Sequence, residues 1–188
     1  FPRQSPWRKI TITETLLPAF DRHFARYKPG LVSLIRSGSV GEAYLDDNGH
    51  VIGMAWFRRN DYYDDQTYHC WLRLPPGRIY QFAGEVAQPY RGTGMAVLLQ
   101  REPWKKFLAE GFSHTRSVVN ISNQPALKMH VKLGFYEIGE SIHVYCLFNC
   151  LNFHRYSRYE GRRLQHLRKS RFSAQAPESA PAERLHDD

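Results

Sequence analysis

The sequence predicts an α/β protein, of the α+β kind, with one domain and a basic tail. Its 188 residues, 42% of them hydrophobic and 23% charged, suffice to bury the core of one average domain. Residues 79–86 alternate bulky apolar side chains with smaller or polar ones, as a half-buried strand does. Residues 95–108 then repeat apolar side chains near helical spacing. Strand and helix patterns therefore follow one another in the same chain.

The N-terminal third predicts a strand, two helices and an antiparallel hairpin. The first helix is expected to break at Pro29-Gly30. Asn48-Gly49 is a dipeptide that tolerates two positive φ values, which predicts a tight hairpin turn. In chain order, the expected elements are a strand at 7–13, helices at 13–27 and 31–36, and strands at 40–45 and 51–57.

The turn between the strand at 79–86 and the following helix is the strongest candidate for a binding site. Gly92 and Gly94 lack Cβ, so the chain can turn sharply and a phosphate can lie against its backbone. The first turn of a helix also offers unpaired N–H groups and the positive end of the helix dipole. The turn therefore predicts a phosphate site, although two glycines also suit an ordinary loop.

The second half of the chain predicts one more helix between strands. Asn123 suits the N-cap of this helix, Pro125 its first turn, and Gly134 its C-terminal end. The helix over 94–109 is expected to kink at Pro103. The strands are expected at 68–74, 114–120, 136–139 and 142–148.

Together, the two motif regions resemble the GNAT superfamily of CoA-dependent N-acyltransferases. The run from Arg91 to Ala96 fits the family's pyrophosphate signature, Q/R-x-x-G-x-G/A, and Asn123 with Ala126 begins its second signature, N-x-x-A, which ends in Gly134-Phe135. The resemblance covers 40–148 well. It implies a mixed, mostly antiparallel central sheet of six to seven strands flanked by about four helices, within a domain over 1–150. It also implies transfer of an acetyl group from acetyl-CoA, the cosubstrate, to a primary amine by direct attack.

The resemblance assigns the expected cofactor contacts. Backbone groups around Glu85 and Val86 would hold the pantetheine arm, and the Val86 N–H would lie near the thioester oxygen. Asn123 would hold CoA from the other side. The expected CoA-binding residues are Val86, Arg91, Gly92, Thr93, Gly94, Met95, Ala96 and Asn123. No metal is expected.

The catalytic residues depart from the family pattern. Many members carry a tyrosine seven residues after the N-x-x-A asparagine, where this chain has His130. A histidinium could protonate the leaving thiolate, but a histidine packed on a helix face is an equal alternative. The glutamate that some members place on the fifth strand is replaced by Val118, which leaves Glu85 as the nearest candidate base. Tyr136 is a further candidate proton donor, or a strand aromatic.

An acidic and aromatic segment precedes the predicted strand at 68–74. Asp61, Asp64 and Asp65 stand among tyrosines, and such carboxylates and rings attract a cationic amine. In the family, this part of the chain helps to wall the acceptor side. A solvated loop is the alternative interpretation.

The segment over 151–188 is predicted to be a basic C-terminal extension, partly helical and then disordered. It holds much of the net charge of +8, and its end is rich in small residues and proline. A solvated helix is the simplest interpretation. Nucleic acid, an acyl carrier protein or an anionic membrane surface are the alternative partners.

Three cysteines without a paired framework suit a reducing compartment, so a cytoplasmic location is expected. No apolar run approaches the ~18 residues of a membrane span. The expected partners are an amine-bearing acceptor and also a second copy of the chain, as a homodimer. Two other functions stay open: an N-acyltransferase that uses long-chain acyl-CoA or acyl carrier protein, and a catalytically degenerate acyl-CoA-binding regulatory module.

Overall fold

The computed structural model describes residues 6–65, 68–148 and 151–167. The chain divides into two units, Phe1–Val118 and Val119–Asp188. This division falls earlier than the boundary at 150 that the sequence suggested. The expected disordered end of the tail, in 168–188, lies outside the described residues.

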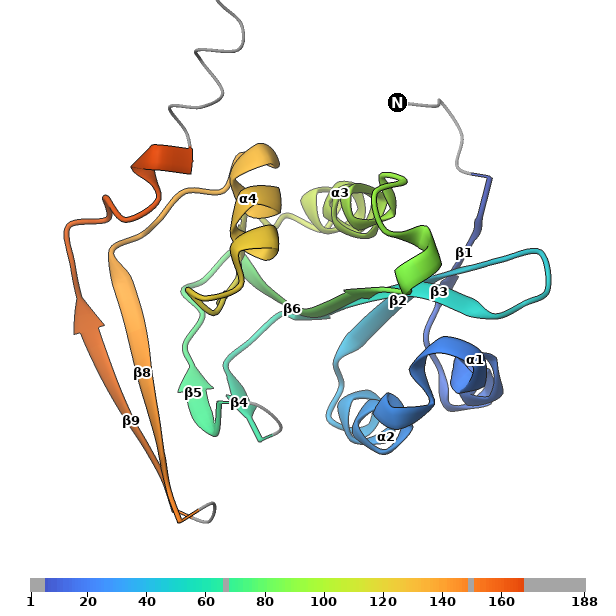
Figure 1. The fold of residues 1–188 in the computed structure, drawn as a ribbon, viewed down its shortest axis with the longest axis horizontal. Helices are drawn as coiled ribbons and strands as arrows, with labels where there is room; N and C mark the ends of the chain where they lie inside the picture. Colours follow the sequence, from blue (N-terminus) through green and yellow to red (C-terminus); the bar gives the residue numbers. More distant parts are fainter. Residues whose placement is uncertain (1–5, 66–67, 149–150, 168–188) are drawn as a thin grey trace, which may run out of the picture. The chain divides into compact units, whose positions relative to one another are not determined.

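A five-stranded sheet forms the centre of the first unit, in the order β1-β2-β3-β6-β7 (Figure 1). All its neighbouring strands are antiparallel except β6 and β7, which are parallel. The sheet is thus mixed and mostly antiparallel, as expected, and it has five strands among the described residues of this unit. Its strands are β1 (Arg8–Thr11), β2 (Val40–Leu45), β3 (Val51–Arg58), β6 (Arg78–Val86) and β7 (His114–Arg116).

Helices cover both faces of this sheet (Figure 1). On one face, α3 (Met95–Ala109) packs on the sheet and buries Met95, Leu99 and Phe107. The other face carries α1 (Asp21–Phe24), α2 (Lys28–Arg36) and the small hairpin of β4 (Tyr62–Asp64) and β5 (Cys70–Leu72). The central strands are therefore buried on both sides, which explains why every residue of β3 before Arg58 is buried.

The expectation of one helix over 13–27, ended by Pro29-Gly30, is wrong in two respects. The segment divides into η1 (Glu14–Phe20), α1 and η2 (Ala25–Tyr27). Pro18 lies inside η1 and has no N–H for a continuous helical ladder. Pro29 does not break the chain, because it lies in the first turn of α2, where the missing N–H has no helical partner to lose.

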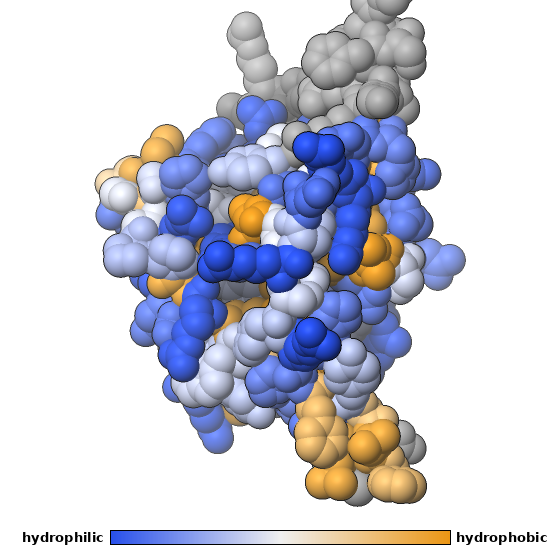
Figure 2. Space-filling view, turned by 90° about the vertical axis from the view of Figure 1, so that its left-hand side faces the viewer, coloured by the Kyte–Doolittle hydropathy of each residue, from blue (hydrophilic) through white to orange (hydrophobic). Residues whose placement is uncertain are grey.

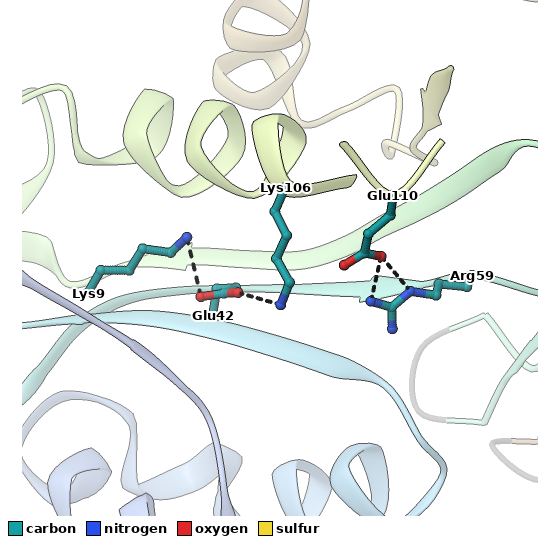
Figure 3. A network of polar contacts seen from close by, with 5 residues as sticks. All are labelled: Lys9, Glu42, Arg59, Lys106 and Glu110. Atoms are coloured by element: carbon teal, nitrogen blue, oxygen red, sulfur yellow. Dashed lines mark hydrogen bonds and ion pairs between the residues drawn. The ribbon is translucent and has the colours of Figure 1, made fainter. Parts of the chain in front are cut away.

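A buried carboxylate links the sheet to α3 (Figure 3). Glu42 of β2 is only 4% exposed, and its two oxygens lie 3.5 Å from Lys9 Nζ and 3.8 Å from Lys106 Nζ. A second pair joins Arg59, just beyond β3, to Glu110 at the end of α3, with 2.8 Å between Nη2 and Oε2. The network ties β1, β2 and α3 together by charge as well as by apolar packing.

The second unit contains α4 (Gln124–Lys132) and a hairpin of β8 (Glu140–Leu147) and β9 (Leu151–Arg158). The strand expected at 136–139 does not form, and the first part of the basic extension, expected to be partly helical, is a strand over Leu151–Arg158, whereas residues 165–167 are helical. Residues 151–158 form a strand because β8, the preceding strand, pairs with them in register from Glu140↔Arg158 to Leu147↔Leu151. Among the described helices, none is long and apolar enough to cross a membrane.

Candidate acyl-CoA and acceptor site

A β-bulge in β6 lies next to the predicted phosphate turn. Phe82 pairs with Trp56 and Glu85 with Met54, so Ala83 and Gly84 together oppose the single residue between those partners on β3. Ala83 has a φ of 46°, and both bulge residues are exposed. Such a bulge bends a strand and frees backbone groups from its ladder.

Beyond the bulge, one edge of β6 has no strand partner among residues 6–65, 68–148 and 151–167. The parallel ladder with β7 ends at Tyr80↔Arg116, whereas β6 continues to Val86. The Ala87 N–H donates to Ile52 O on the β3 side at 2.9 Å. Because N–H directions alternate along a strand, the Val86 N–H faces the opposite edge. The Val86 N–H therefore points to the edge of β6 that has no strand partner among the described residues.

The glycine turn begins α3 with open backbone. Gly94 is the N-cap in the left-handed conformation, with a φ of 90°, and no side chain caps the helix. Gly92 has a φ of 80°, and a Cβ built on either glycine would meet nothing within 4 Å. The N-terminal N–H groups of α3 thus lie beside open space, an arrangement that suits an anion such as a pyrophosphate.

Arg91 folds back from this turn onto the end of β6. Its Nε donates to Val86 O at 3.1 Å, and its Nη2 lies 3.1 Å from Glu85 Oε1. Thr93 Oγ1 donates to Tyr90 O at 2.7 Å, a hydrogen bond within the turn that stabilises its conformation. The structure therefore brings seven of the expected CoA-binding residues together: Val86, Arg91, Gly92, Thr93, Gly94, Met95 and Ala96. It also engages Glu85, the candidate base, in an ion pair.

A cavity of about 190 Å³ opens on the sheet face opposite α3. Asp61 and Asp65, two of the predicted acceptor residues, line it, whereas Asp64 is buried and does not. The Leu74 N–H and the Arg73 guanidinium hold the pKa of Asp61 below its ordinary value. The Asp65 carboxylate is exposed and makes no ion pair with a described residue. The aromatic lining residues Tyr62, Tyr63 and Trp71 belong to the predicted acidic and aromatic segment, whereas the sequence did not predict Ser33, Leu34, Ser37 and Arg58.

Aromatic rings connect this cavity to β6. Tyr62 lines the cavity and stacks on Phe82, with 4.9 Å between ring centroids. Phe82 stacks in turn on Tyr80 at 5.2 Å and immediately precedes the bulge. Arg58 donates to Ser37 O at the end of α2, so its positive charge meets the negative end of the helix. Asp61 is paired with Arg73 at 2.7 Å, so Asp65 supplies the remaining negative charge of the lining, which favours a cation.

His130 and Asn123 lie on α4, in the second unit. The Asn123 side chain caps this helix by accepting from the Ala126 N–H at 3.2 Å. His130 Nδ1 donates to Ala126 O at 2.8 Å, since a carbonyl can only accept. Its Nε2 is buried without a partner among the described residues, and burial lowers the pKa of the ring. A neutral ring of this tautomer has no Nε2 proton to give, which favours the packed histidine over the acid.

Tyr136, the other candidate donor, is 62% exposed and lies outside any strand. Among the described residues, no group of three or more His, Cys, Asp or Glu side chains lies close enough to hold a metal ion.

Comparison with known proteins identifies the class. The profile of the Acetyltransferase (GNAT) family matches residues 8–135, more than half of the chain. The fold and this match make the protein an N-acetyltransferase of the GNAT class. The chain belongs to the GNAT acetyltransferase family. No curated protein sequence matches it.

Three solved structures are similar over most of their length. An aminoglycoside N-acetyltransferase, AAC(6')-Iy in complex with CoA, is 21% identical with a TM-score of 0.53, and the match covers 69% of this chain and 92% of that one. An N-acetyltransferase from Staphylococcus aureus Mu50 is 17% identical with a TM-score of 0.53, over 81% and 96%. An integron cassette protein from the mobile metagenome of V. cholerae is 14% identical with a TM-score of 0.51, over 88% and 99%. At these identities, the similarity supports the fold.

Proposed function

We propose that the protein transfers the acetyl group of acetyl-CoA to a primary amine by direct attack. The observation that carries the proposal is the uncapped, glycine-lined start of α3 beside the free edge of β6. The pyrophosphate would bind the N–H groups of residues 92–96, and the pantetheine arm would extend along β6. The Val86 N–H would then donate to the oxyanion that forms when the amine attacks the thioester carbonyl.

Alignment of the two reactants supplies most of the rate in this proposal. Glu85 is held by Arg91, and the neutral ring of His130, with its proton on Nδ1, has no Nε2 proton to donate, so the proposal uses neither Glu85 as the base nor His130 as the acid. A neutral amine held near the thioester needs chiefly orientation and an oxyanion donor. The variant Tyr136→Phe tests the remaining candidate proton donor. A fall in the kcat of this variant would indicate that the Tyr136 phenol protonates the thiolate.

The amine would enter from the face that carries the cavity. Asp65, the aromatic lining and the row of rings toward the bulge support a cationic acceptor there. We expect Asp65→Asn to raise the KM for the amine severalfold and to leave the KM for acetyl-CoA unchanged. Asp47→Asn is the matched control, because Asp47 is also an exposed aspartate and lies in the turn between β2 and β3. Equal effects of the two variants would refute the assignment of the cavity.

A thermal-shift series with CoA, acetyl-CoA, a long-chain acyl-CoA and NADPH tests the donor. Ligand at about 100 times its Kd adds about 2.7 kcal/mol to the free energy of unfolding, or about 5–10 °C in Tm. We expect acetyl-CoA, but not NADPH, to raise Tm. Release of free thiol in the presence of an amine would then demonstrate transfer. Binding of acetyl-CoA without thiol release from any amine offered would instead indicate a regulatory module.

A further inference from the structure

Three aromatic rings of the first unit stack together next to the bulge of β6. The ring centroid of Phe82 lies 4.9 Å from that of Tyr62 and 5.2 Å from that of Tyr80, with ring planes inclined by 28° and 7°. The two tyrosine rings also contact each other, with 6.1 Å between their centroids. We call these three rings the aromatic wall. Both tyrosines are buried and Phe82 is half-buried, so the tyrosines fix the position of the Phe82 ring.

The direction of β6 places the aromatic wall beyond the acyl group of the cosubstrate. This inference rests on the proposed function: with the pyrophosphate at residues 92–96 and the thioester at the Val86 N–H, the cosubstrate runs along β6 toward lower residue numbers. The acyl group then continues past Gly84 and Ala83 and meets the wall at Phe82. Because the ladder with β7 ends at Tyr80↔Arg116, no strand among the described residues occupies this edge.

The bulge leaves room for a short acyl group between the thioester and the wall. Ala83 and Gly84 have the smallest side chains that this position could carry, and a Cβ built on Gly84 would meet nothing within 4 Å. Ala83 has a φ of 46°, which L residues rarely adopt. Strained backbone of this kind persists where the surrounding structure holds it, and it gathers at functional sites. The fold thus keeps two small residues at the point where the acyl group would lie.

The length of this stretch sets a limit on the acyl chain. Val86 and Phe82 are four residues apart, which corresponds to about 10–13 Å of strand, nearer the lower value because two bulge residues take the place of one. An extended acyl group of about eight carbons, joined by bonds of about 1.5 Å, has a similar length. A longer chain would have to turn away from the wall. Its end would then lie in water or on the protein surface, which is mainly hydrophilic on the face that Figure 2 shows.

We propose that Phe82 determines the acyl-chain specificity of the enzyme, because its ring stops acyl groups longer than roughly eight carbons. Tyr62 and Tyr80 are positioning residues, since they hold the Phe82 ring across the path of the chain. Tyr62 also lines the cavity proposed for the amine, so the wall separates the acyl group from that cavity. The acetyl group is short enough to end before the wall, whereas a long-chain donor is not.

Calorimetric titration with acetyl-CoA, octanoyl-CoA and dodecanoyl-CoA tests the proposal without requiring turnover. The quantity compared is the Kd of each longer acyl-CoA divided by the Kd of acetyl-CoA for the same protein. We expect Phe82→Ala to lower the ratio for dodecanoyl-CoA by on the order of tenfold, because the methylene groups beyond the wall gain an apolar site. Phe82→Trp should raise the ratio for octanoyl-CoA severalfold, since a larger ring brings the wall closer to the thioester.

Phe112→Ala is the matched control. Phe112 is also half-buried and contacts an aromatic ring, that of Phe107 at 6.0 Å, but it follows α3 and lies outside β6. We expect both ratios to stay unchanged in this variant. Circular dichroism and Tm show whether each variant folds. Phe82→Leu, which keeps most of the apolar volume, should give an intermediate ratio and serves if Phe82→Ala does not fold.

The possible results separate this inference from the proposed function. Equal ratios for dodecanoyl-CoA in Phe82→Ala or Phe82→Leu and in the original chain would overturn the role of Phe82 alone, as would an equal fall in Phe112→Ala. Failure of the original chain to bind any of the three acyl-CoA species would overturn the proposed function, and the inference with it.

Discussion

Gly53 of β3 lies where the sheet supports the first turns of α3, and adding one methyl group there should disturb both stability and ligand binding. A Cβ at Gly53 would lie 2.9 Å from Leu99 Cδ1, 3.1 Å from Met95 Cγ and 3.3 Å from Met95 Sδ. Ordinary contacts begin at 3.4 Å, so Leu99 must move by about half an ångström. Both neighbours are fully packed, with exposed fractions of 0% for Met95 and 2% for Leu99.

Overpacking of this kind costs about 1–3 kcal/mol, which corresponds to a fall in Tm of about 2–12 °C for a chain of this length. The assay is thermal unfolding of Gly53→Ala, followed by calorimetric titration with CoA. Because Met95 belongs to the first turn of α3, we also expect the variant to bind CoA more weakly. Gly84→Ala is the control for stability, since its Cβ would meet nothing within 4 Å and its φ is not positive. An unchanged Tm in Gly53→Ala would refute the packing described for α3 on the sheet.

Two further predictions concern charge. Glu42→Gln should lower the free energy of unfolding by about 1–3 kcal/mol, because it removes the buried counter-charge of Lys9 and Lys106 (Figure 3). Glu110→Gln should lower it by only about 0–1 kcal/mol, because the pair of Glu110 with Arg59 is partly exposed. Chemical denaturation measures both losses, and equal losses would contradict the role of burial. Burial lowers the pKa of His130 below its ordinary 6.5, so the unfolded state binds the proton more readily and stability should fall as the pH drops below about 6.5. Unfolding of His130→Phe across pH 5–8 should show a smaller loss toward acid, and an unchanged slope would contradict the lowered pKa.

Local signals predicted several elements well. The turn at Asp46–Gly49 and the strands on either side are where Asn48-Gly49 and the flanking alternation place them, because a short hairpin depends on neighbours in sequence. The cap of α4 is also as predicted, since an asparagine can reach the N–H three residues on without help from the rest of the fold.

The features that the sequence did not predict depend on pairing between strands. The bulge in β6 depends on the register with β3, although the small pair Ala83-Gly84 inside a bulky strand was a usable signal. The first part of the basic extension forms β9 and not a helix, because β8 supplies hydrogen-bond partners that composition cannot show; residues 165–167 are helical. The cavity likewise collects residues from α2, β3, β4 and β5, which only the fold brings together.

In the candidate site, too, local features were predictable from the sequence and features that depend on long-range pairing were not. The residues over 91–96 could be named from the sequence because the signature is contiguous and the geometry of a helix start is local. Asp64 resembled its neighbours in sequence, but strand alternation buries it while Asp61 and Asp65 line the cavity. Side-chain direction in a short strand depends on register, which the pattern alone did not fix.

The affinity of CoA for Gly92→Val, compared with Gly49→Val, tests the central claim most directly. The two glycines have nearly the same backbone, with φ of 80° and 81°, and a Cβ at either would meet nothing within 4 Å. Valine should therefore strain both turns similarly, by about 1–2 kcal/mol. We predict that only Gly92→Val weakens CoA binding, by at least about tenfold in Kd by calorimetry, because its side chain would occupy the place of the pyrophosphate. Equal affinity in the two variants would contradict the assignment of the turn at the start of α3 to CoA.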